Sequence, residues 1–408
     1  MNKTKCLLIT SIFPPTHGGS AIVYENICRF SPHNTIHVLA PKKDYTDGKQ
    51  IEGWQAYDAS APYPVHRIEL IRPLMVQSNS LLHSLWLLLS VDIPLRIRVF
   101  LKVRNIVREE KINVICIGEL VSTSWVGILA KRWLGCKVIN YIHGEEITTT
   151  LSFRHFKNRR QYYLKQADAI IAVSDFTRET LIRQMDANPN KIHLITNGVN
   201  LSKFYPQTKS ASLQARYKLE NKQIILTVGR LIPRKGIDTT IKALPQILKK
   251  CPNAHYLVVG TGEFRSSLEK LAKTLGVSDN VTFTGRIENN ELTEHYSLCD
   301  LFVMPNREMD DHDTEGFGLV FLEANACGKA VVGGRAGGVI EAVQDGNNGL
   351  LVDGTNTDEV ANTIATLLCD NTLRKKIEAQ GLIRANASSS EIRAHQFLDV
   401  CDQITKEI

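Results

Sequence analysis

Three short stretches of the sequence carry residues that could bind a phosphate or a sugar. The first is residues 14–20 (Pro-Pro-Thr-His-Gly-Gly-Ser), which follow an apolar run and precede a helical pattern that begins near Ala21. Gly18 and Gly19 would let backbone N–H groups approach an anion at the positive end of that helix. The stretch lacks the G-x-G-x-x-G and G-K-[ST] spacings of known phosphate loops, so a plain turn is an equal alternative.

The second stretch is Gly-Arg-Leu-Ile-Pro-Arg-Lys-Gly at residues 229–236, again between a strand pattern and a helix pattern. The neighbouring sequence offers these cations no carboxylate partner, so folding alone explains them poorly. They suit a diphosphate, which Arg230 can bind through two parallel hydrogen bonds and Lys235 as a point charge. The alternative is a solvated basic turn.

The third stretch, Glu-Gly-Phe-Gly-Leu-Val-Phe-Leu-Glu at residues 315–323, is the most specific of the three. On one continuous helix, carboxylates eight residues apart would lie about 80° apart and would not share a face. We therefore expect Glu315 in a glycine-rich loop and Glu323 in the first turns of the helix that follows. Each carboxylate can accept hydrogen bonds from two adjacent hydroxyls, which suits a sugar.

Short apolar runs alternate with amphipathic segments along nearly the whole chain, which is typical of parallel sheets with helical crossovers. This pattern predicts an α/β fold with two doubly wound halves. Helices are expected among others at Ile237–Lys250, Glu263–Leu275, Leu319–Cys327 and Thr357–Leu368. The expected strands are Cys6–Thr10, Ile36–Ala40, Val114–Gly118, Val138–His143, Ala169–Val173, Ile192–Thr196, Ile224–Val228, Tyr256–Gly260, Val281–Thr284, Leu301–Met304 and Ala330–Gly333.

After residues 197–199 the strand pattern gives way to turn and linker residues that run through Pro206 to about Ser212, which places a domain boundary in this stretch. We expect a first domain at residues 1–205 and a second at residues 206–387. A C-terminal helix at about residues 388–408 is expected to pack back on the first domain. Two such domains would face a central cleft that binds ligand at the carboxyl ends of their strands.

The length and charge of the chain set broad limits on its function. The chain of 408 residues is longer than one small hydrophobic core requires. Its contents of hydrophobic residues (43%) and charged residues (22%) are near the average for globular proteins. Residues 1–200 hold 25 basic and 16 acidic residues, whereas the remainder holds 24 and 26. The basic excess of the first half indicates an anionic partner, with scattered solvated charge as the alternative.

The cysteines and apolar runs bear on where the protein works. The nine cysteines form no C-x-x-C pair, so we expect buried, reduced thiols, no zinc site and a cytoplasmic protein. The N-terminal residues 1–13 are interpreted as a buried strand and not as a signal peptide. The longest apolar stretch, Leu81–Leu89, is shorter than the roughly 18 residues that a membrane span needs.

These motifs together resemble the retaining glycosyltransferases of family 4, also called group 1. The similarity is strongest between Thr227 and Gly354, and includes the 283–286 (Phe-Thr-Gly-Arg) and 346–349 (Gly-Asn-Asn-Gly) segments. Residues 313–318 look most like transferases that act on lipid-linked or phosphoinositide acceptors. The resemblance implies a GT-B fold, with an N-terminal domain for the acceptor and a C-terminal domain for a nucleotide diphosphate sugar.

The resemblance also implies roles for individual residues. Arg230 and Lys235 would hold the donor diphosphate, and Gly18 and Gly19 would close over it. Glu323 would bind the ribose, and His143 would lie near C6 of the donor sugar, with a core histidine as the alternative interpretation. The transferred sugar would be bound by Glu315 and the amides of Gly316, Phe317 and Gly318, and Leu319 would also belong to the donor site. The base would lie by Arg286 and the backbone of Ile287.

The reaction that follows is transfer of a hexose from a UDP- or GDP-sugar to a glycan or glycolipid hydroxyl, with α linkage and without metal or other cofactor. The acidic run at residues 310–313 is expected to be an exposed loop. The alternatives are a nucleotide-sugar epimerase of the same fold and a non-catalytic binding protein.

The acceptor side is expected to meet a membrane. A basic, apolar segment at Leu81–Val107 and a cluster formed by Arg154, Lys157, Arg159 and Arg160 favour peripheral contact with an anionic inner-membrane surface. An ordinary core helix is the alternative for the first segment. Nucleic acid is not expected as a partner, because no recognition motif accompanies the charge.

Overall fold

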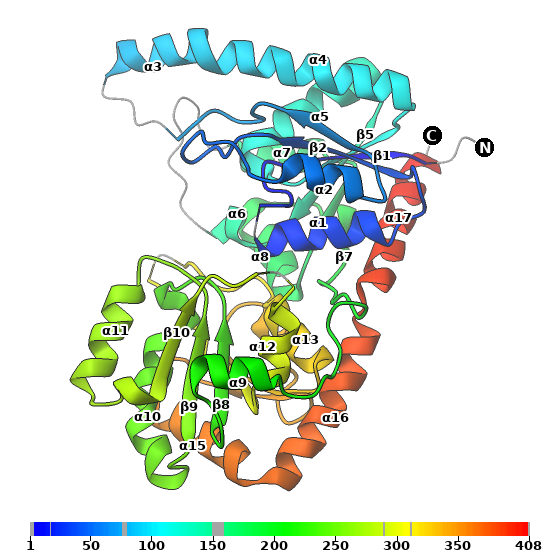
Figure 1. The fold of residues 1–408 in the computed structure, drawn as a ribbon. Helices are drawn as coiled ribbons and strands as arrows, with labels where there is room; N and C mark the ends of the chain where they lie inside the picture. Colours follow the sequence, from blue (N-terminus) through cyan, green and yellow to red (C-terminus); the bar gives the residue numbers. More distant parts are fainter. Residues whose placement is uncertain are drawn as a thin grey trace. The chain divides into compact units, whose positions relative to one another are not determined.

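The computed structural model describes residues 4–16, 18–75, 80–148, 159–288, 290–310 and 312–406. The chain forms two compact units, one of residues 1–196 with 390–408 and the other of residues 197–389. Both are built on a parallel sheet that has helices on its two faces, as Figure 1 shows.

The first unit holds a seven-stranded sheet in the order β3-β2-β1-β4-β5-β6-β7. The strands are all parallel, and the order reverses direction between β1 and β4. The strands β1, β2, β4 and β6 are wholly buried, because helices cover both faces and leave no solvent side. The strands are β1 (Cys6–Ile9), β2 (Ile36–Pro41), β3 (Val65–Ile68), β4 (Val114–Ile117), β5 (Lys137–Ile142), β6 (Ala169–Ala172) and β7 (Ile192–Leu194).

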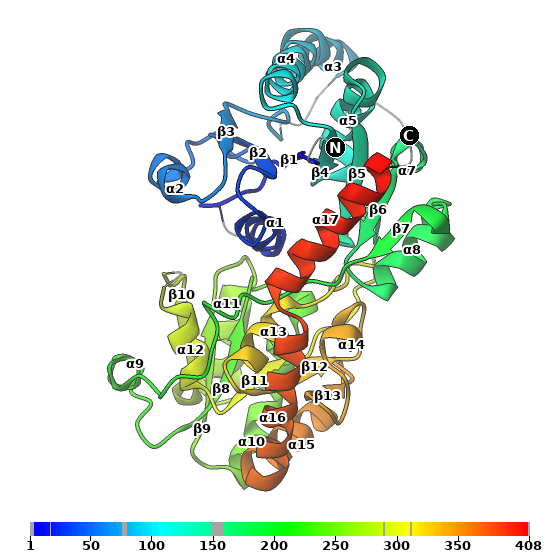
Figure 2. The same ribbon diagram turned by 90° about the vertical axis from the view of Figure 1, so that its right-hand side faces the viewer.

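The helices of the first unit form two layers around this sheet. Figure 1 shows α4 and α5 on one face, and Figure 2 shows α1 and α17 side by side on the other, where they contact each other. The helices are α1 (Gly19–Arg29), α2 (Trp54–Ser60), α3 (Leu81–Leu87), η1 (Leu88–Asp92, a π-helical turn), α4 (Ile93–Glu110), α5 (Leu120–Leu134), α6 (Glu145–Thr148), α7 (Arg160–Gln166), α8 (Asp175–Met185), η2 (Pro189–Lys191) and α17 (Ser390–Lys406).

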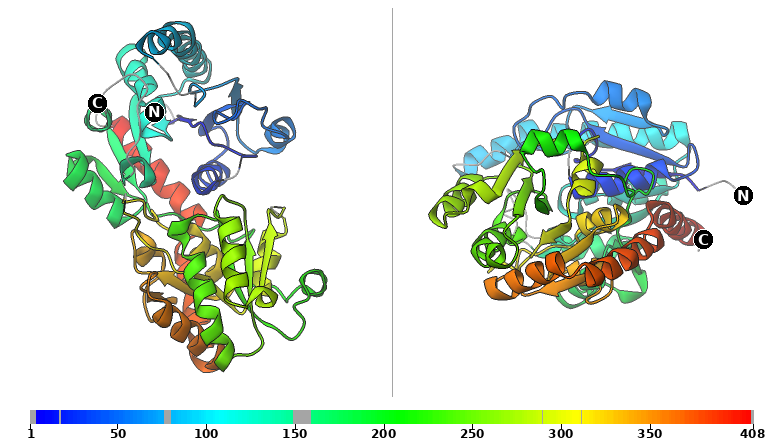
Figure 3. Two further views of the ribbon diagram at one scale, coloured as in Figure 1. Left: turned by 90° about the vertical axis from the view of Figure 1, so that its left-hand side faces the viewer. Right: turned by 60° about the horizontal axis from the view of Figure 1, so that its bottom comes forward.

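The second unit holds a six-stranded parallel sheet in the order β10-β9-β8-β11-β12-β13, with its reversal between β8 and β11. Helices α10 and α15 contact each other over one face, and α13 and α16 do so over the other (Figure 3). The strands are β8 (Gln223–Val228), β9 (Ala254–Val259), β10 (Val281–Gly285), β11 (Leu301–Met304), β12 (Ala330–Gly334) and β13 (Gly349–Val352). The helices are α9 (Ala211–Tyr217), η3 (Pro233–Lys235), α10 (Ile237–Lys250), α11 (Arg265–Thr274), η4 (Ser278–Asn280), α12 (Leu292–Leu298), α13 (Leu319–Ala326), α14 (Val339–Ala342), α15 (Thr357–Cys369) and α16 (Asn371–Ala387).

The expected α/β fold with two doubly wound sheets is confirmed, and each of the eleven expected strands corresponds to an observed one. Two strands, β3 and β13, were not expected. Both lie at the edge of a sheet and are only partly buried. In β3, His66 and Arg67 interrupt the apolar run, whereas β13 (Gly-Leu-Leu-Val) has an apolar run like that of an inner strand.

The second unit begins at Asn197, earlier than the expected boundary at residues 205 and 206. Two hydrogen bonds tie the intervening segment to this unit: the Val199 N–H donates to the Ser388 carbonyl (2.9 Å), and Thr293 Oγ1 donates to the Lys203 carbonyl (2.9 Å). Residues 197–205 therefore have the composition of a linker but pack as part of the second unit.

The helices and the cysteines bear on the expectations that no segment spans a membrane and that the thiols are buried and reduced. Among the residues that the structure describes, no helix is both long and apolar enough to pass through a bilayer. All nine cysteines are free thiols, and eight of them are buried, whereas Cys369 is exposed.

Candidate functional site

In the second unit, the loop after β8 carries the residues expected to hold a diphosphate. Arg230 is exposed, while Arg234 and Lys235 in the short helix η3 are only 7% and 9% exposed. Gly236 ends the loop with a φ of +69°, and a Cβ there would lie 2.0 Å from the Pro305 carbonyl oxygen. The loop after β8 therefore packs directly against the loop after β11, and only glycine fits at the contact.

Two ion pairs join these loops. The Lys235 ammonium donates a hydrogen bond to Glu315 Oε2, and Arg234 Nη1 donates to Asp313 Oδ1 at 2.5 Å. The Lys235 and Glu315 side chains are 11% and 15% exposed. The structure thus supplies the carboxylate partners that the sequence near residue 230 does not contain, and it places the acidic and basic motifs in one cluster.

The electrostatic balance keeps Glu315 ionised. Burial raises the pKa of its carboxyl group, but the charges of Lys235 and Arg234 outweigh this effect and hold the pKa below the ordinary value. The carboxylate in turn holds the Lys235 ammonium in one place. An ammonium has three N–H donors, so the pair leaves Lys235 with donors for a further anion.

The loop that contains Glu315 leads into helix α13, as expected, and Glu323 lies in the second turn of that helix. Gly318 has a φ of +88°, and a Cβ there would lie 2.7 Å from the Phe321 ring. The Gly338 N–H donates to the Glu315 carbonyl at 2.8 Å and fixes the loop backbone. The Phe317 and Leu319 side chains are buried at 2% and 8% exposure, so these residues can offer a ligand their amides but not their side chains.

Glu323 is 3% exposed, and its Oε2 accepts a hydrogen bond from the Tyr296 hydroxyl at 2.6 Å. Burial raises the pKa of the Glu323 carboxyl. The sequence motif pointed to Glu323 but not to Tyr296, which lies on α12. Because a carboxylate has two oxygens, the bond to Tyr296 orients Glu323 and leaves Oε1 for a second donor.

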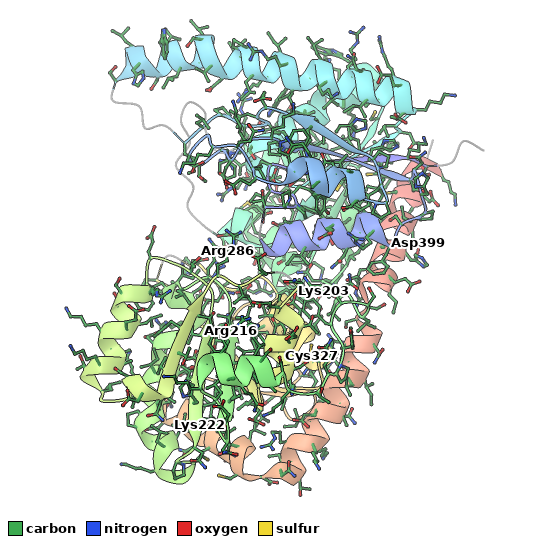
Figure 4. The ribbon with its side chains drawn as sticks, viewed as in Figure 1. Lys203, Arg216, Lys222, Arg286, Cys327 and Asp399 are labelled. Atoms are coloured by element: carbon green, nitrogen blue, oxygen red, sulfur yellow. The ribbon has the colours of Figure 1, made fainter. Side chains whose placement is uncertain are left out.

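The carboxyl ends of β9 and β10 complete this edge of the sheet. Arg286, labelled in Figure 4, follows β10. Its side chain is exposed, and Ile287 beside it is half-buried. A Cβ at Gly260 would lie 1.9 Å from the Gly229 carbonyl, and one at Gly262 would lie 2.4 Å from the Leu231 carbonyl. These close approaches bring the loops after β8 and β9 together at the edge of the sheet where doubly wound sheets bind their ligands.

Asn306, Asp310 and Asp313 lie in the loop after β11. Asn306 is 1% exposed, and its amide has no hydrogen-bond partner among the described residues. The acidic run at residues 310–313 was expected to be an exposed loop, but Asp313 is held by the buried Arg234. Asp310 and His312 are exposed, and Asp311 lies outside the described residues.

In the first unit, Gly18 and Gly19 stand at the start of helix α1. A Cβ at Gly18 would make only an ordinary contact of 3.6 Å with Ile12, and one at Gly19 would meet nothing within 4 Å. The packing of the described residues therefore does not require glycine here. The first turn of α1 has no acidic residue and no side-chain cap, which suits an anionic ligand.

The loop before these glycines is anchored by Glu119, which the sequence motifs did not indicate. Its Oε1 accepts hydrogen bonds from Thr10 Oγ1 at 2.7 Å and from the Ser11 N–H at 2.9 Å. Burial raises the pKa of the Glu119 carboxyl. Glu119 follows β4, so it connects the carboxyl ends of the two central strands β1 and β4.

His143 follows β5 and has a defined tautomer. The Tyr24 hydroxyl donates its only proton to the Gly118 carbonyl at 2.7 Å, so its oxygen must accept from His143 Nε2, which lies 2.9 Å away. Burial lowers the pKa of His143 to about 4. The imidazole is therefore neutral near pH 7, with a proton on Nε2 and a lone pair on Nδ1.

The two glutamates after His143 differ in their surroundings. Glu145 is exposed, whereas Glu146 is half-buried and accepts a hydrogen bond from the His143 N–H (3.2 Å to Oε2). Burial raises the pKa of Glu146 to about 7. Arg160 was expected in an exposed basic cluster, but it is only 5% exposed. Burial lowers the pKa of its guanidinium, and the charge of Glu146, which raises that pKa, only partly offsets this effect. Of the other members of that cluster, Arg159 is exposed, and Arg154 and Lys157 lie outside the described residues.

Family comparisons cover both units. The model described as Glycosyltransferase Family 4 matches residues 18–203, and the model described as Glycosyl transferases group 1 matches residues 209–383. The GDP-mannose-dependent alpha-(1-6)-phosphatidylinositol monomannoside mannosyltransferase of Mycolicibacterium smegmatis is 30% identical over 373 residues, which cover 89% of each chain. The GDP-mannose-dependent monoacylated alpha-(1-6)-phosphatidylinositol monomannoside mannosyltransferase of Corynebacterium glutamicum is 30% identical over 404 residues, which cover 97% of each chain.

Solved structures show the same fold. Sucrose-phosphate synthase from Thermosynechococcus elongatus aligns with a TM-score of 0.77 at 24% identity, covering 100% of both chains. HepE from Anabaena in complex with UDP aligns with a TM-score of 0.74 at 21% identity, covering 98% of this chain and 100% of that one. At these identities the likeness concerns the GT-B architecture alone.

Proposed function

Because the chain belongs to the group 1 glycosyltransferases of family 4 and is an enzyme that uses a nucleotide sugar, we propose that it transfers a hexose with retention to a lipid-linked acceptor. The observation that carries this proposal is the ion-paired cluster of Lys235 and Glu315 beside Arg230, at the carboxyl edge of the second sheet. It combines cations for a diphosphate with a carboxylate for sugar hydroxyls.

The donor is a UDP- or GDP-hexose, and GDP-mannose is the first to test, since the relatives from M. smegmatis and C. glutamicum are named for it. Arg230 and Lys235 bind the diphosphate. Glu315 and the amides of residues 316–319 bind the sugar hydroxyls, and the free oxygen of Glu323 binds the ribose. Arg286 and the backbone of Ile287 lie by the base.

In the reaction, the bond between C1 of the sugar and the diphosphate oxygen breaks while a bond from the acceptor oxygen to C1 forms on the same face. The acceptor proton passes to an oxygen of the departing diphosphate. Arg230 and Lys235 stabilise the charge that develops on the diphosphate, which binds the transition state more tightly than the ground state. This route assigns no step to a metal or an organic cofactor.

His143 acts here as a neutral hydrogen-bonding group. Tyr24 holds the proton of its imidazole on Nε2, so Nδ1 can accept a hydrogen bond from a hydroxyl of the donor sugar. Gly18 and Gly19 at the start of α1 provide amides for the donor phosphate without a side chain in the way.

The acceptor side faces a membrane in this proposal. Along α3, η1 and α4, large apolar side chains remain exposed, including Leu82 (81%), Trp86 (60%) and Leu89 (58%). Ile93, at 39%, and Ile97, at 55%, continue the same line at helical spacing.

Other residues of α4, Val99, Val103 and Ile106, pack into the core, so the exposed line is a second apolar face. Arg98 and Arg108 on this helix are also exposed. An exposed apolar face with basic residues is typical of a helix that lies in a bilayer interface.

Donor choice and acceptor dependence test the proposal together. The purified protein is incubated with UDP-, GDP- and ADP-hexoses, and its thermal midpoint, the slow hydrolysis of the donor and the transfer to a phosphoinositide glycolipid are measured. We expect stabilisation by one donor and α-linked product only when acceptor is present. Product formed without acceptor would instead indicate an epimerase.

Variants at the cation cluster provide the second arm. Arg230→Ala and Lys235→Ala are each expected to lower turnover by about two orders of magnitude or more, as loss of a transition-state charge partner does. Lys270→Ala, an exposed lysine on α11, is the control. Near-normal turnover in both variants would overturn the assignment.

A further inference from the structure

Two histidines and a glutamate meet in the first unit at the edge of the sheet opposite to the proposed transfer site. His37 is the second residue of β2, and His66 is the second residue of β3. Glu110 is the last residue of α4, which covers this face of the sheet. The transfer residues of this unit follow the carboxyl ends of the strands, whereas this cluster lies near the amino ends of two of them.

The polar atoms of the three side chains are close enough to bind one ion. His37 Nδ1 lies 3.4 Å from His66 Nε2, and His37 Nε2 lies 3.9 Å from Glu110 Oε2. One nitrogen or oxygen from each of the three residues falls within 4.8 Å of the others. The two imidazole rings are nearly parallel, with an interplanar angle of 10°.

One ring nitrogen of His37 has no hydrogen-bond partner among the described residues. This nitrogen is Nε2, and the side chain that carries it is 0% exposed. The 3.4 Å separation from His66 is longer than the usual nitrogen hydrogen bond of about 2.7–3.2 Å. A buried nitrogen without a partner destabilises a fold. With Nδ1, the nitrogen that faces His66, bound to an ion, Nε2 would carry the ring proton, 3.9 Å from Glu110 Oε2.

We propose that His37, His66 and Glu110 bind one divalent transition-metal ion of the Zn²⁺ class, with water as the fourth ligand. Two imidazole nitrogens at about 2.0–2.1 Å from a tetrahedral metal lie about 3.4 Å apart, which is the separation of His37 Nδ1 and His66 Nε2. Two nitrogens and one carboxylate oxygen form an ordinary zinc ligand set.

The surroundings favour the ligand form of both histidines. Burial lowers the pKa of His37 and of His66, so both imidazoles are neutral near pH 7 and keep a lone pair for a metal. The Glu110 side chain is 36% exposed at the end of its helix, so its carboxylate can rotate inward without disturbing the core. The charges of Lys5 and Lys102 also reach these histidines and oppose a bound cation.

The metal would have a structural role. Strand β3 is an edge strand that is only partly buried, and a shared ion would connect it to β2 and to the last turn of α4. Because the cluster lies away from the carboxyl ends of the strands, the ion should raise thermal stability without changing the donor affinity.

The test is a titration of the full-length protein, freed of any affinity tag and stripped of metal by a chelator. Zn²⁺ is titrated by calorimetry, and Co²⁺ is followed by the visible absorption of a tetrahedral site. We expect one ion per chain, a rise in the thermal midpoint, and no change in the affinity for the donor.

His66→Asn and Glu110→Gln are the informative variants, since both side chains are partly exposed and their replacement should leave the fold intact. Each should weaken metal binding by about tenfold or more, since even indirect changes around a metal cost that much. Lys102→Met removes an opposing charge and should tighten binding. His395→Asn and Glu391→Gln, at exposed positions on α17, are the matched controls and should bind as the original protein does.

Two results would overturn the proposal. One is the absence of stoichiometric Zn²⁺ and Co²⁺ binding by the folded, stripped protein, which would leave the three residues as a hydrogen-bonded cluster. The other is binding that persists unchanged in His66→Asn and Glu110→Gln, which would place the metal elsewhere. Neither result bears on the sugar transfer, which is measured separately.

Discussion

The Lys235 ammonium donates a hydrogen bond to Glu315 Oε2 across 80 positions of sequence, and both side chains are largely buried. This ion pair connects the basic motif after β8 to the acidic motif before α13. Replacing one member of a buried ion pair leaves the other charge uncompensated and destabilises the fold. Replacing both members leaves no such charge and destabilises the fold less or not at all. The pair can therefore separate the effects of these residues on stability from their effects on turnover.

Replacement of Lys235 should impair both properties. Lys235→Met removes a cation from the diphosphate site and strands the Glu315 carboxylate, so we expect kcat/KM to fall by about 10²–10³ and the free energy of unfolding to fall as well. Urea unfolding and steady-state kinetics measure the two effects. Lys270→Met is the control.

The double variant Lys235→Met/Glu315→Gln should recover much of the lost stability but none of the lost turnover. Recovery of both would mean that Lys235 serves only to neutralise Glu315. A single variant as stable as the original protein would contradict the buried ion pair.

Tyr24→Phe should affect turnover through His143. Phenylalanine keeps the ring that contacts His143 but removes the hydroxyl that holds the imidazole proton on Nε2. A hydrogen bond worth about 1.4 kcal/mol in the transition state corresponds to a tenfold change, so we expect kcat to fall about tenfold with little change in the KM for the donor. Tyr205→Phe, at a tyrosine that is 48% exposed, is the control.

Nitrogen NMR of His143 reports the tautomer directly. The original protein should show a neutral ring protonated on Nε2 down to about pH 4, and Tyr24→Phe should show a mixture of tautomers. An Nε2-protonated ring in both proteins, with equal kcat, would show that Tyr24 does not position His143.

Stability should depend on pH through Glu146. Burial raises its pKa to about 7, whereas the ordinary value is 4.5. Between these values the folded protein binds the extra proton, so this group stabilises the fold below about pH 4.5 and the contribution is lost as the pH rises through 7. Glu146→Gln lacks this loss, and its stability relative to the original protein should therefore increase from pH 5 to pH 8.

The gain is at most about 3 kcal/mol, the value that corresponds to a pKa shift of this size, and it is smaller where solvent screens the half-buried carboxyl. Urea unfolding at several pH values measures it, with Glu145→Gln as the exposed neighbouring control. Because His143 titrates in every variant, only the difference between variants is compared. A difference that shrank as the pH rose would contradict the raised pKa.

The exposed apolar face of α3 and α4 should bind membranes. Replacing Trp86 and Leu89 with glutamine removes large apolar side chains that are 60% and 58% exposed, so the folded core is not disturbed. We expect this variant to float with anionic vesicles at least several-fold less than the original protein. Ile383→Gln, at a position 62% exposed on α16, is the matched control.

Vesicles of zwitterionic lipid test the contribution of charge. Binding should be weaker than to anionic vesicles and weaker still in high salt, because Arg98 and Arg108 act through screened attraction. Equal flotation with both lipids, or by the variant and the original protein, would rule out this surface as the docking site.

The sequence alone determined the order of the elements and the positions of the glycine-rich loops. Runs such as Cys6–Ile9 are apolar throughout because both faces of a parallel strand are buried, and that signal is local. The same local reasoning separated Glu315, in its loop, from Glu323, in its helix. The edge strand β3 gives no such signal because His66 and Arg67 interrupt its apolar run, whereas the short run of β13 (Gly-Leu-Leu-Val) does carry it.

The tertiary structure alone decided which of these residues act together. Arg234 meets Asp313 from 79 positions away, and His143 meets Tyr24 from 119 positions away. The burial of Arg160 and the meeting of His37 with His66 likewise depend on how the elements pack. Periodicity describes each segment in turn, but pKa values, tautomers and ion pairs depend on neighbours that only the folded sheet brings within a few ångströms.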